Sequence, residues 1–184
     1  CLIVALLTSI SFVLQPVQPV HAAALTVTTT TDELSSPGMG CSLREAITNA
    51  NDNADTYPEC YTSGTYGNDG IILPAGTYTL DIGATDENAN LDGDLDISST
   101  GGDLTIEGVG AIIDGNNAER VFDICPTGSC DIHVIFGGVT IQNGNGGSEG
   151  GGGIRNPSGT TTVNSCTISN NTANQGGGIL NESG

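Results

Sequence analysis

Short stretches in which apolar and polar residues alternate follow one another along most of the chain, and each predicts a short β-strand with one buried face. Glycine, asparagine or proline separates most of these stretches, as is typical of tight turns. Two longer stretches, Leu25–Thr31 and Gly70–Leu80, open the series, and a turn interrupts the second one. The remaining predicted strands are Leu104–Glu107, Ala111–Ile113, Val121–Ile124, Ile132–Phe136, Val139–Gln142, Thr161–Val163 and Thr167–Ser169. The pattern therefore indicates an all-β fold.

One segment departs from this pattern and predicts a short α-helix. In the range Leu43–Ala50, apolar residues stand at positions i, i+3, i+4 and i+7, which places them on one face of a helix. Ser42 precedes this range and Glu45 follows three residues later, which is the spacing of a capping box. A short helix is marginal alone in water and needs a surface to pack on. Residues 51–68, which follow it, are polar and are predicted to form a loop.

Two parts of the sequence recur at similar intervals. Gly151–Gly159 returns as Gly176–Gly184 after 25 residues, and Val139–Asn143 returns more weakly as Cys166–Asn170 after 27 residues. A period in this range indicates a solenoid in which each repeat forms one coil. A leucine-rich repeat has a similar period, but Leu180 is the only leucine in the last part of the chain. We therefore predict stacked coils of short strands, with Gly-rich turns and with the helix covering the first coil.

The first residues predict export from the cell. The apolar run Leu2–Leu14 is too short to cross a bilayer comfortably, and small residues further on allow signal-peptidase cleavage after Ala22 or Ala24. We therefore predict a signal peptide at residues 1–24, an N-terminal cap at 25–70 and coils at 71–184, which we expect to continue further in the natural protein. The mature protein is expected to be secreted or bound to the cell surface, without a transmembrane helix.

Export makes disulfides possible, and the mature part has five cysteines. We expect Cys41 to pair with Cys60 and Cys125 to pair with Cys130 across a tight turn. Cys166 stands in an alternating strand, where a reduced cysteine behaves as a small buried apolar residue. A zinc site is disfavoured because paired C-x-x-C spacings are missing and the mature part has a single histidine.

The charge of the chain restricts its partners. The formal net charge is −18, and the three basic residues are all arginines. Such a chain repels the phosphates of nucleic acids and anionic lipids, so neither is an expected partner. The acidity either keeps an extracellular protein soluble or attracts inorganic cations.

One acidic segment is a candidate Ca²⁺ site. Oxygen-bearing side chains alternate along it, at Asn88, Asn90, Asp92, Asp94 and Asp96. A glycine stands where an EF-hand-like loop turns, and hard oxygen ligands with net negative charge suit Ca²⁺. The twelfth position carries a serine and not a bidentate glutamate, so we expect weak binding. The alternative is a solvated acidic loop that leads into a strand.

A catalytic motif is not evident in the sequence. Glycoside hydrolysis needs two carboxylates on either side of the sugar bond. Four acids in the predicted coils are candidates, namely Asp103, Asp114, Asp123 and Asp131. A Ser-His-Asp triad would depend on His133, which alternates with apolar neighbours and is expected to face outward. Arg120 is expected to form an ion pair, and Arg155, in a Gly-rich turn, is expected to be exposed.

The segment Cys41–Ala46, with the sequence CSLREA, resembles the signature of the CSLREA domain of secreted bacterial surface proteins. Leu73–Tyr78 resembles the opening coil of pectin-lyase-like folds, and the Gly-Gly-Gly-Ile and Ile168–Asn171 pieces loosely resemble the repeats of polymorphic outer-membrane proteins. The resemblance implies a right-handed parallel β-helix solenoid with a short N-terminal capping helix. It does not imply one reaction, because this fold carries several activities.

These observations predict an exported scaffold for adhesion or envelope display, without catalysis in this part of the protein. No cofactor is required, and Ca²⁺ is the candidate ion. The expected partners are an extracellular polysaccharide or a host or envelope surface. The alternative is a carbohydrate-active enzyme, either a polysaccharide lyase or a glycoside hydrolase, whose active coils lie mostly beyond residue 184.

Overall fold

The computed structural model describes residues 22–83, 87–98, 101–128 and 130–182. Apart from its last three residues, the predicted signal peptide lies outside this range. Within the described residues there are one helix, α1 (Leu43–Asp52), and fourteen strands. The strands are β1 (Ala22–Thr26), β2 (Thr62–Ser63), β3 (Thr65–Ile72), β4 (Gly76–Thr79), β5 (Leu95–Ile97), β6 (Leu104–Glu107), β7 (Ala111–Asp114), β8 (Phe122–Ile124), β9 (His133–Gly137), β10 (Thr140–Gln142), β11 (Ile154–Asn156), β12 (Thr160–Asn164), β13 (Thr167–Ser169) and β14 (Ile179–Asn181).

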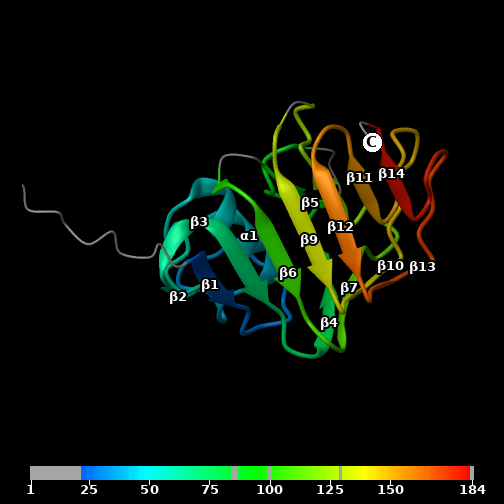
Figure 1. Ribbon diagram of the computed structural model, residues 1–184. Coiled ribbons are helices and arrows are strands. Elements are labelled where there is room, and N and C mark those ends of the chain that lie inside the picture. The colour runs from blue at the N-terminus through cyan, green and yellow to red at the C-terminus, as the bar shows by residue number, and fades with distance from the viewer. Residues whose placement is uncertain (1–21, 84–86, 99–100, 129, 183–184) are drawn as a thin grey trace, which may run out of the picture.

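The strands form three sheets. One sheet has six strands in the order β12-β9-β6-β3-β1-β2, and the other two have four strands each, in the orders β13-β10-β7-β4 and β14-β11-β8-β5. Every pair is parallel except β1 with β2, which is antiparallel. From β3 onward the chain visits the three sheets in rotation, so that every third strand extends the same sheet (Figure 1). The prediction of a mainly parallel β-fold with one short helix is confirmed.

The intervals seen in the sequence recur in the strand pairing. Ile154 on β11 pairs with Ile179 on β14, which is the 25-residue offset, and Ile141 on β10 pairs with Ile168 on β13, which is the 27-residue offset. Asn156 also donates a hydrogen bond from Nδ2 to the Oδ1 atom of Asn181 in the next strand of its sheet, at 3.0 Å. Similar residues therefore stand beside one another in adjacent parallel strands.

Apolar side chains at equivalent positions of adjacent strands form the core. In the six-stranded sheet, Leu25, Ile71, Ile106 and Phe136 occupy successive strands at one level of the register and are all fully buried. The Phe136 ring contacts the ring of Phe122 from another sheet, with centroids 4.8 Å apart and planes inclined by 55°. The three sheets thus share one core.

The Gly-rich pieces differ from the prediction. They were expected to be turns, yet each contains a three-residue strand, β11 or β14. Only the alternate residues Ile154 and Asn156 of β11 are fully buried, so the strand is too short to produce a recognisable alternation. The predicted loop at residues 51–68 also contains β2 and the start of β3.

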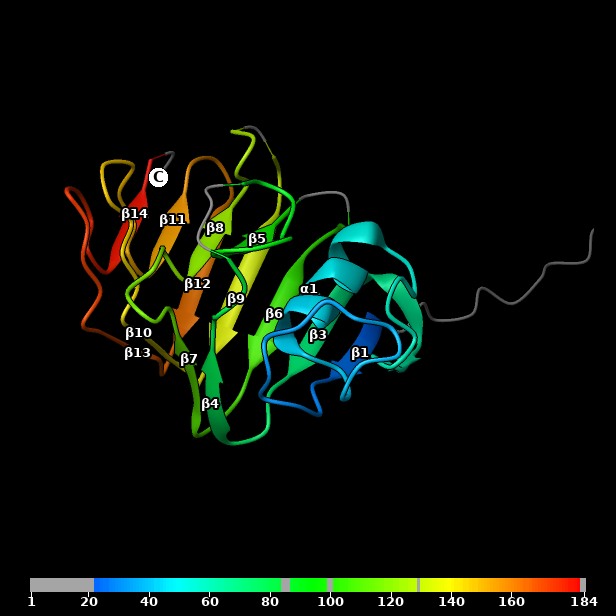
Figure 2. The ribbon, with the colours of Figure 1, turned by 180° about the vertical axis from the view of Figure 1, so that it is seen from behind.

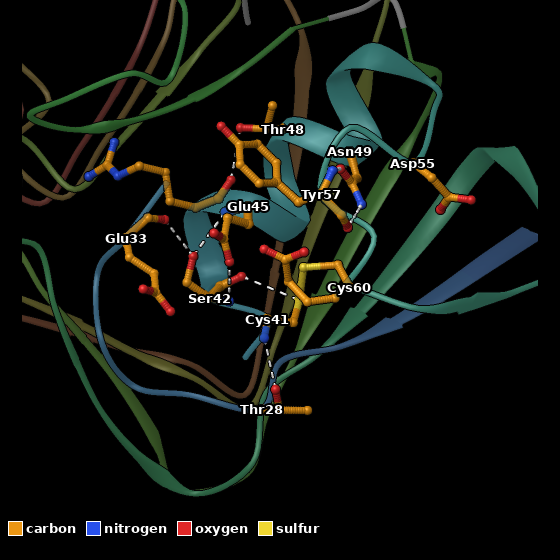
Figure 3. Close-up of a disulfide and its surroundings, with 12 residues drawn as sticks. Thr28, Glu33, Cys41, Ser42, Glu45, Thr48, Asn49, Asp55, Tyr57 and Cys60 are labelled. Atoms are coloured by element: carbon orange, nitrogen blue, oxygen red, sulfur yellow. Dashed lines mark hydrogen bonds between the residues drawn. A yellow bond between two sulfur atoms is a disulfide. The ribbon is translucent and has the colours of Figure 1, made fainter. Parts of the chain in front are cut away.

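The helix begins with the predicted capping box. The Ser42 Oγ atom accepts a hydrogen bond from the Glu45 backbone N–H at 3.1 Å, and the Ser42 N–H donates to Glu45 Oε2 at 2.9 Å (Figure 3). The predicted disulfide between Cys41 and Cys60 is present and ties the residue before this cap to the loop after the helix (Figure 3). Together they hold the N-terminal end of α1 in place.

The helix lies at the N-terminal end of the sheets, where it contacts β3 and β5 (Figure 2). The sequence predicts burial of one apolar face only, but the polar residues Arg44, Glu45 and Asn49 are also fully buried. They are buried because segments before and after the helix cover its polar side. This burial on most sides makes α1 a core element.

Arg44 is the centre of these contacts. Its guanidinium group forms a bidentate ion pair with Asp32, with Nε–Oδ1 at 2.7 Å and Nη2–Oδ2 at 3.0 Å. The same group donates to the backbone carbonyls of Asp92, Gly93 and Asp94 at 3.3, 2.8 and 2.7 Å. One fully buried arginine therefore connects the N-terminal segment, the helix and the segment that leads into β5.

Polar side chains from the helix and the segment before it bind backbone groups along β5 and just after β4. Asn51 donates to the Asp96 carbonyl at 2.8 Å and accepts from the Ser98 N–H at 2.9 Å, along the edge of β5 that faces away from β8. Asp32 accepts hydrogen bonds from the backbone of Asp81 and Ile82, just after β4, at 3.0 and 3.1 Å. These side chains take the place of a preceding strand.

Candidate functional site

Three buried carboxylates meet on the sheet that contains β5 and β8. Asp96 on β5 pairs in register with Asp123 on β8, and Asp94 immediately precedes β5. Carboxylate oxygens of the three residues lie within 4.8 Å of one another, and each residue is at most 2% exposed. We call Asp94, Asp96 and Asp123 the carboxylate cluster.

Two arginines contact the carboxylate cluster. Arg120 Nε lies 2.7 Å from Asp94 Oδ2, and Arg120 Nη2 lies 2.9 Å from Glu149 Oε2. Arg155 stands beside Asp123 in the register and places Nη1 3.0 Å from Asp123 Oδ2. The prediction of an exposed Arg155 was wrong, because its side chain is only 19% exposed. The expected ion pair of Arg120 is present, with the distant Asp94 and Glu149 and, at 3.5 Å, with Asp123 three residues further along the chain.

Burial and mutual repulsion shift the protonation of the cluster. Burial, followed by the charge of Asp94, raises the pKa of Asp96 to about 8. Burial also raises the pKa of Asp123, against the opposing effects of Arg120 and Arg155. The pKa of Arg120 is raised, because Asp123 and Asp94 outweigh the effect of its burial. Asp96 is therefore mainly protonated at neutral pH in the folded protein.

We predict that Asp96→Asn changes the pH dependence of stability. The folded-state pKa of Asp96 lies above its unfolded value, so the folded chain binds the proton more tightly and this stabilisation is lost as the pH rises from about 4 to about 8. Asparagine does not ionise. The advantage of the wild type over the variant should therefore decrease by at least about 1 kcal/mol between pH 5 and pH 9.

Denaturant unfolding at several pH values in the presence of a chelator measures this difference. Asp103→Asn is the matched control, because Asp103 is an exposed acid, and this variant should keep the wild-type pH profile. A constant difference between the wild type and Asp96→Asn over the whole range contradicts the prediction.

The structure divides the residues of the predicted Ca²⁺ loop. Asp94 and Asp96 lie together in the cluster, whereas Asn88 is exposed and Asp92 directs its backbone carbonyl to Arg44. Asn90 donates its backbone N–H to Asp96 Oδ2 at 2.9 Å, while its side-chain Nδ2 atom donates to the Arg44 carbonyl. The five residues thus do not surround one point as an EF-hand loop would.

The sequence pattern selects the third carboxylate, Asp123, only as a candidate catalytic acid and does not place it with Asp94 and Asp96, although the repeat carries a signal for that position. Asp123 follows Asp96 by 27 residues, the same offset that relates Ile141 to Ile168. Projecting acids by this period would have brought the two together. Arg44 and Asp32 were also missed, because a local helical pattern does not show which polar side chains become buried.

The other acids considered for catalysis do not gather at one place. Asp114 ends β7 and accepts hydrogen bonds from Gln142 and Asn143, each at 2.8 Å. Asp103 Oδ1 accepts from the backbone N–H of His133 at 2.9 Å, and the His133 ring lies 2.8 Å from Thr162 Oγ1. Asp131 precedes β9 and is exposed. Of the four candidate acids, only Asp123 belongs to the carboxylate cluster.

A surface hollow of about 260 Å³ adjoins the arginine side of the cluster. Its walls come from two segments, 118–120 and 145–149, and include Arg120 and Glu149. The lining is mainly backbone, small side chains and charge, without an aromatic residue on which a sugar ring would stack. Tyr57, Tyr61 and Tyr66 lie elsewhere, and Tyr66 donates its hydroxyl to Asp55 at 2.7 Å.

The second predicted disulfide, between Cys125 and Cys130, is also present, and Cys166 is a free, partly buried thiol. No helix among the described residues has the length and apolar character needed to cross a membrane. Comparison with models of known protein families, with curated proteins and with solved structures found no match for this chain.

Proposed function

We propose that the chain forms an exported right-handed parallel β-helix that serves as a scaffold for adhesion or envelope display. The rotation of the chain through three parallel sheets supports this proposal, because a coil of three strands produces that order. Connections between parallel strands are almost always right-handed, which supports the hand. The resemblance of Cys41–Ala46 to the CSLREA signature agrees with a cap before the first coil.

The position of the helix supports the same proposal. In a β-helix the first coil has free strand edges and an open apolar end that need cover. Here Asn51 and Asp32 bind backbone groups at and next to those edges, and the buried apolar residues of α1 belong to the same core as the strands. The residues of the CSLREA-like segment therefore cap the helix and pack it against the first strands, which agrees with a scaffold.

Chemistry at the surface and at the cysteines supports export. Two disulfides are compatible with an oxidising compartment outside the cytoplasm. A net charge of −18 keeps such a chain soluble and disfavours nucleic acids and anionic lipids as partners. Neutral polysaccharides and cationic surface components are the partner classes that this charge allows.

The test uses the full chain with its own leader, exported from a bacterial host and purified after processing. Immobilised polysaccharides and intact envelopes are screened for binding, and released reducing ends and unsaturated products are measured in the same wells. Binding without turnover is the expected result. Turnover that is lost in a folded Asp123→Asn variant would replace the scaffold proposal with the carbohydrate-active alternative.

The carboxylate cluster favours a second candidate function, the binding of Ca²⁺. Three carboxylates offer hard oxygen ligands, and the Oδ1 atoms of Asp96 and Asp123 are buried without a hydrogen-bond partner among the described residues. Arg120 and Arg155 oppose an added cation because they already neutralise Asp94 and Asp123. Weak binding is therefore expected.

Isothermal titration calorimetry with millimolar calcium chloride tests this second function. The wild type and Asp103→Asn should release heat, and Asp96→Asn should not. Absence of heat from the wild type at millimolar calcium overturns the calcium proposal and leaves the scaffold proposal unaffected.

A further inference from the structure

A buried carboxylate outside the cluster faces the first residues of the folded chain. The Ala23 backbone nitrogen donates to Asp69 Oδ1 at 3.2 Å, and Ala23 and Asp69 are 1% and 3% exposed. Gly67 donates to the same oxygen at 3.1 Å. The second oxygen, Oδ2, is buried and has no hydrogen-bond partner among the described residues. The Asp69 carboxylate can therefore accept more hydrogen bonds than the described residues donate to it.

Asp69 also occupies a position where other strands carry uncharged residues. In the six-stranded sheet its register partner is Leu104, which pairs with Val134, and Val134 pairs with Thr161. An ionised carboxylate at such a position is costly unless a positive charge accompanies it. Burial accordingly raises the pKa of Asp69 to about 6, although the hydrogen bonds from Ala23 and Gly67 oppose the shift.

We infer that cleavage between Ala22 and Ala23 supplies the missing positive charge, as the α-ammonium group of Ala23 bound to Asp69. Hydrolysis by a signal peptidase adds the water oxygen to the Ala22 carbonyl carbon, and both water protons end on the Ala23 nitrogen. The nitrogen that donates one hydrogen bond to Oδ1 thereby becomes a cation with three donors, next to the unpartnered Oδ2. The inference rests on the proposed export of the chain.

The strand pairing separates the two cleavage positions that the sequence allows. β1 begins at Ala22, and Ala24 pairs with Gly70 of β3 and with Ser63 of β2. Cleavage after Ala24 removes both the buried Ala23 and this pairing, and leaves Asp69 without a partner from β1. Cleavage after Ala22 removes one exposed residue and its pairing with Thr65, and leaves the buried Ala23 and the pairing of Ala24 in place.

The composition of the chain makes the test unambiguous. The three basic residues of this chain are all arginines, so residues 23–184 with the leader removed carry a single amine, the α-amino group. Mass spectrometry of the exported full chain first identifies the N-terminal residue, which is expected to be Ala23. Acetylation by an N-hydroxysuccinimide ester is then followed between pH 6 and pH 10 in the folded and the denatured protein.

An ion-paired ammonium is not nucleophilic, so acetylation of the folded wild type at pH 8 should be at least about tenfold slower than in the denatured chain. The midpoint of the rate against pH should move upward from the ordinary value near 8. Asp69→Asn should remove both effects, and the exposed control Asp103→Asn should keep them. The comparison of folded and denatured wild type remains decisive if Asp69→Asn does not fold.

The outcomes separate the two proposals. Failure of the leader to be removed overturns both the export proposal and the ion pair. A processed chain that begins at another residue, or an Ala23 amine that reacts equally fast in the folded and denatured protein, overturns the ion pair and leaves export standing.

Discussion

Replacement of Arg44 by alanine is expected to lower the free energy of unfolding by about 3–5 kcal/mol, since it leaves a buried acid without its counter-charge. Arg44 is fully buried and neutralises Asp32, whose side chain is 3% exposed. The substitution also removes the donors for three backbone carbonyls of residues 92–94. Each buried carbonyl left without a donor adds to the loss.

Urea unfolding of the processed protein, followed by circular dichroism, measures this effect. Arg155→Ala is the matched control, because it also removes one ion-paired arginine, but from a side chain that is 19% exposed, and its main partner Asp123 keeps Arg120 beside it. Arg44→Lys should recover little, since an ammonium group lacks the planar set of donors that binds a carboxylate and carbonyls together. An effect of Arg44→Ala no larger than that of Arg155→Ala contradicts the assigned role.

Removal of the Cys41–Cys60 disulfide by paired serine substitutions is expected to cost about 3 kcal/mol, because the bond restricts the unfolded chain over a separation of 19 residues. Both cysteines are fully buried, so the serine hydroxyls would also need partners in an apolar setting. The loss should be concentrated at α1, whose first residue lies two positions after Cys41.

Unfolding under oxidising conditions and hydrogen exchange of the α1 amides test this expectation. The matched control is the corresponding pair of substitutions at Cys125 and Cys130, which lie only five positions apart. The shorter loop restricts the unfolded chain less, so its removal should cost less. Equal losses for both pairs, or unchanged exchange in α1, contradict the prediction.

Much of the strand pattern could be predicted from the sequence. Segments such as Leu104–Glu107 and Thr167–Ser169 form strands with the predicted bounds, because alternation and turn residues both define them locally. The strands after the glycines, β11 and β14, have only three residues each and depend on pairing with their neighbours. Pairing is a tertiary property, so a local pattern does not show it.

The candidate site shows the same division. Asp94 and Asp96 could be selected from a local acidic pattern, but Asp123 joins them only through the strand register. Arg120 forms its ion pair with Asp94 because packing brings the two side chains together, and their positions in the sequence do not indicate it. The sequence pattern does not indicate Asp69 either, because its contact with the Ala23 nitrogen arises only when β1 and β3 pair.

The side chains of Asn51 and Asp32 have a consequence for assembly. Hydrogen-bonding groups at one end of the sheets are already occupied by amide and carboxylate groups of the same chain. The groups concerned are the outer edge of β5 and the backbone just after β4, which belong to two different sheets. A strand of a second molecule would therefore have to displace Asn51 or Asp32 before it could pair at these positions, which protects this end of two of the sheets from edge-to-edge aggregation.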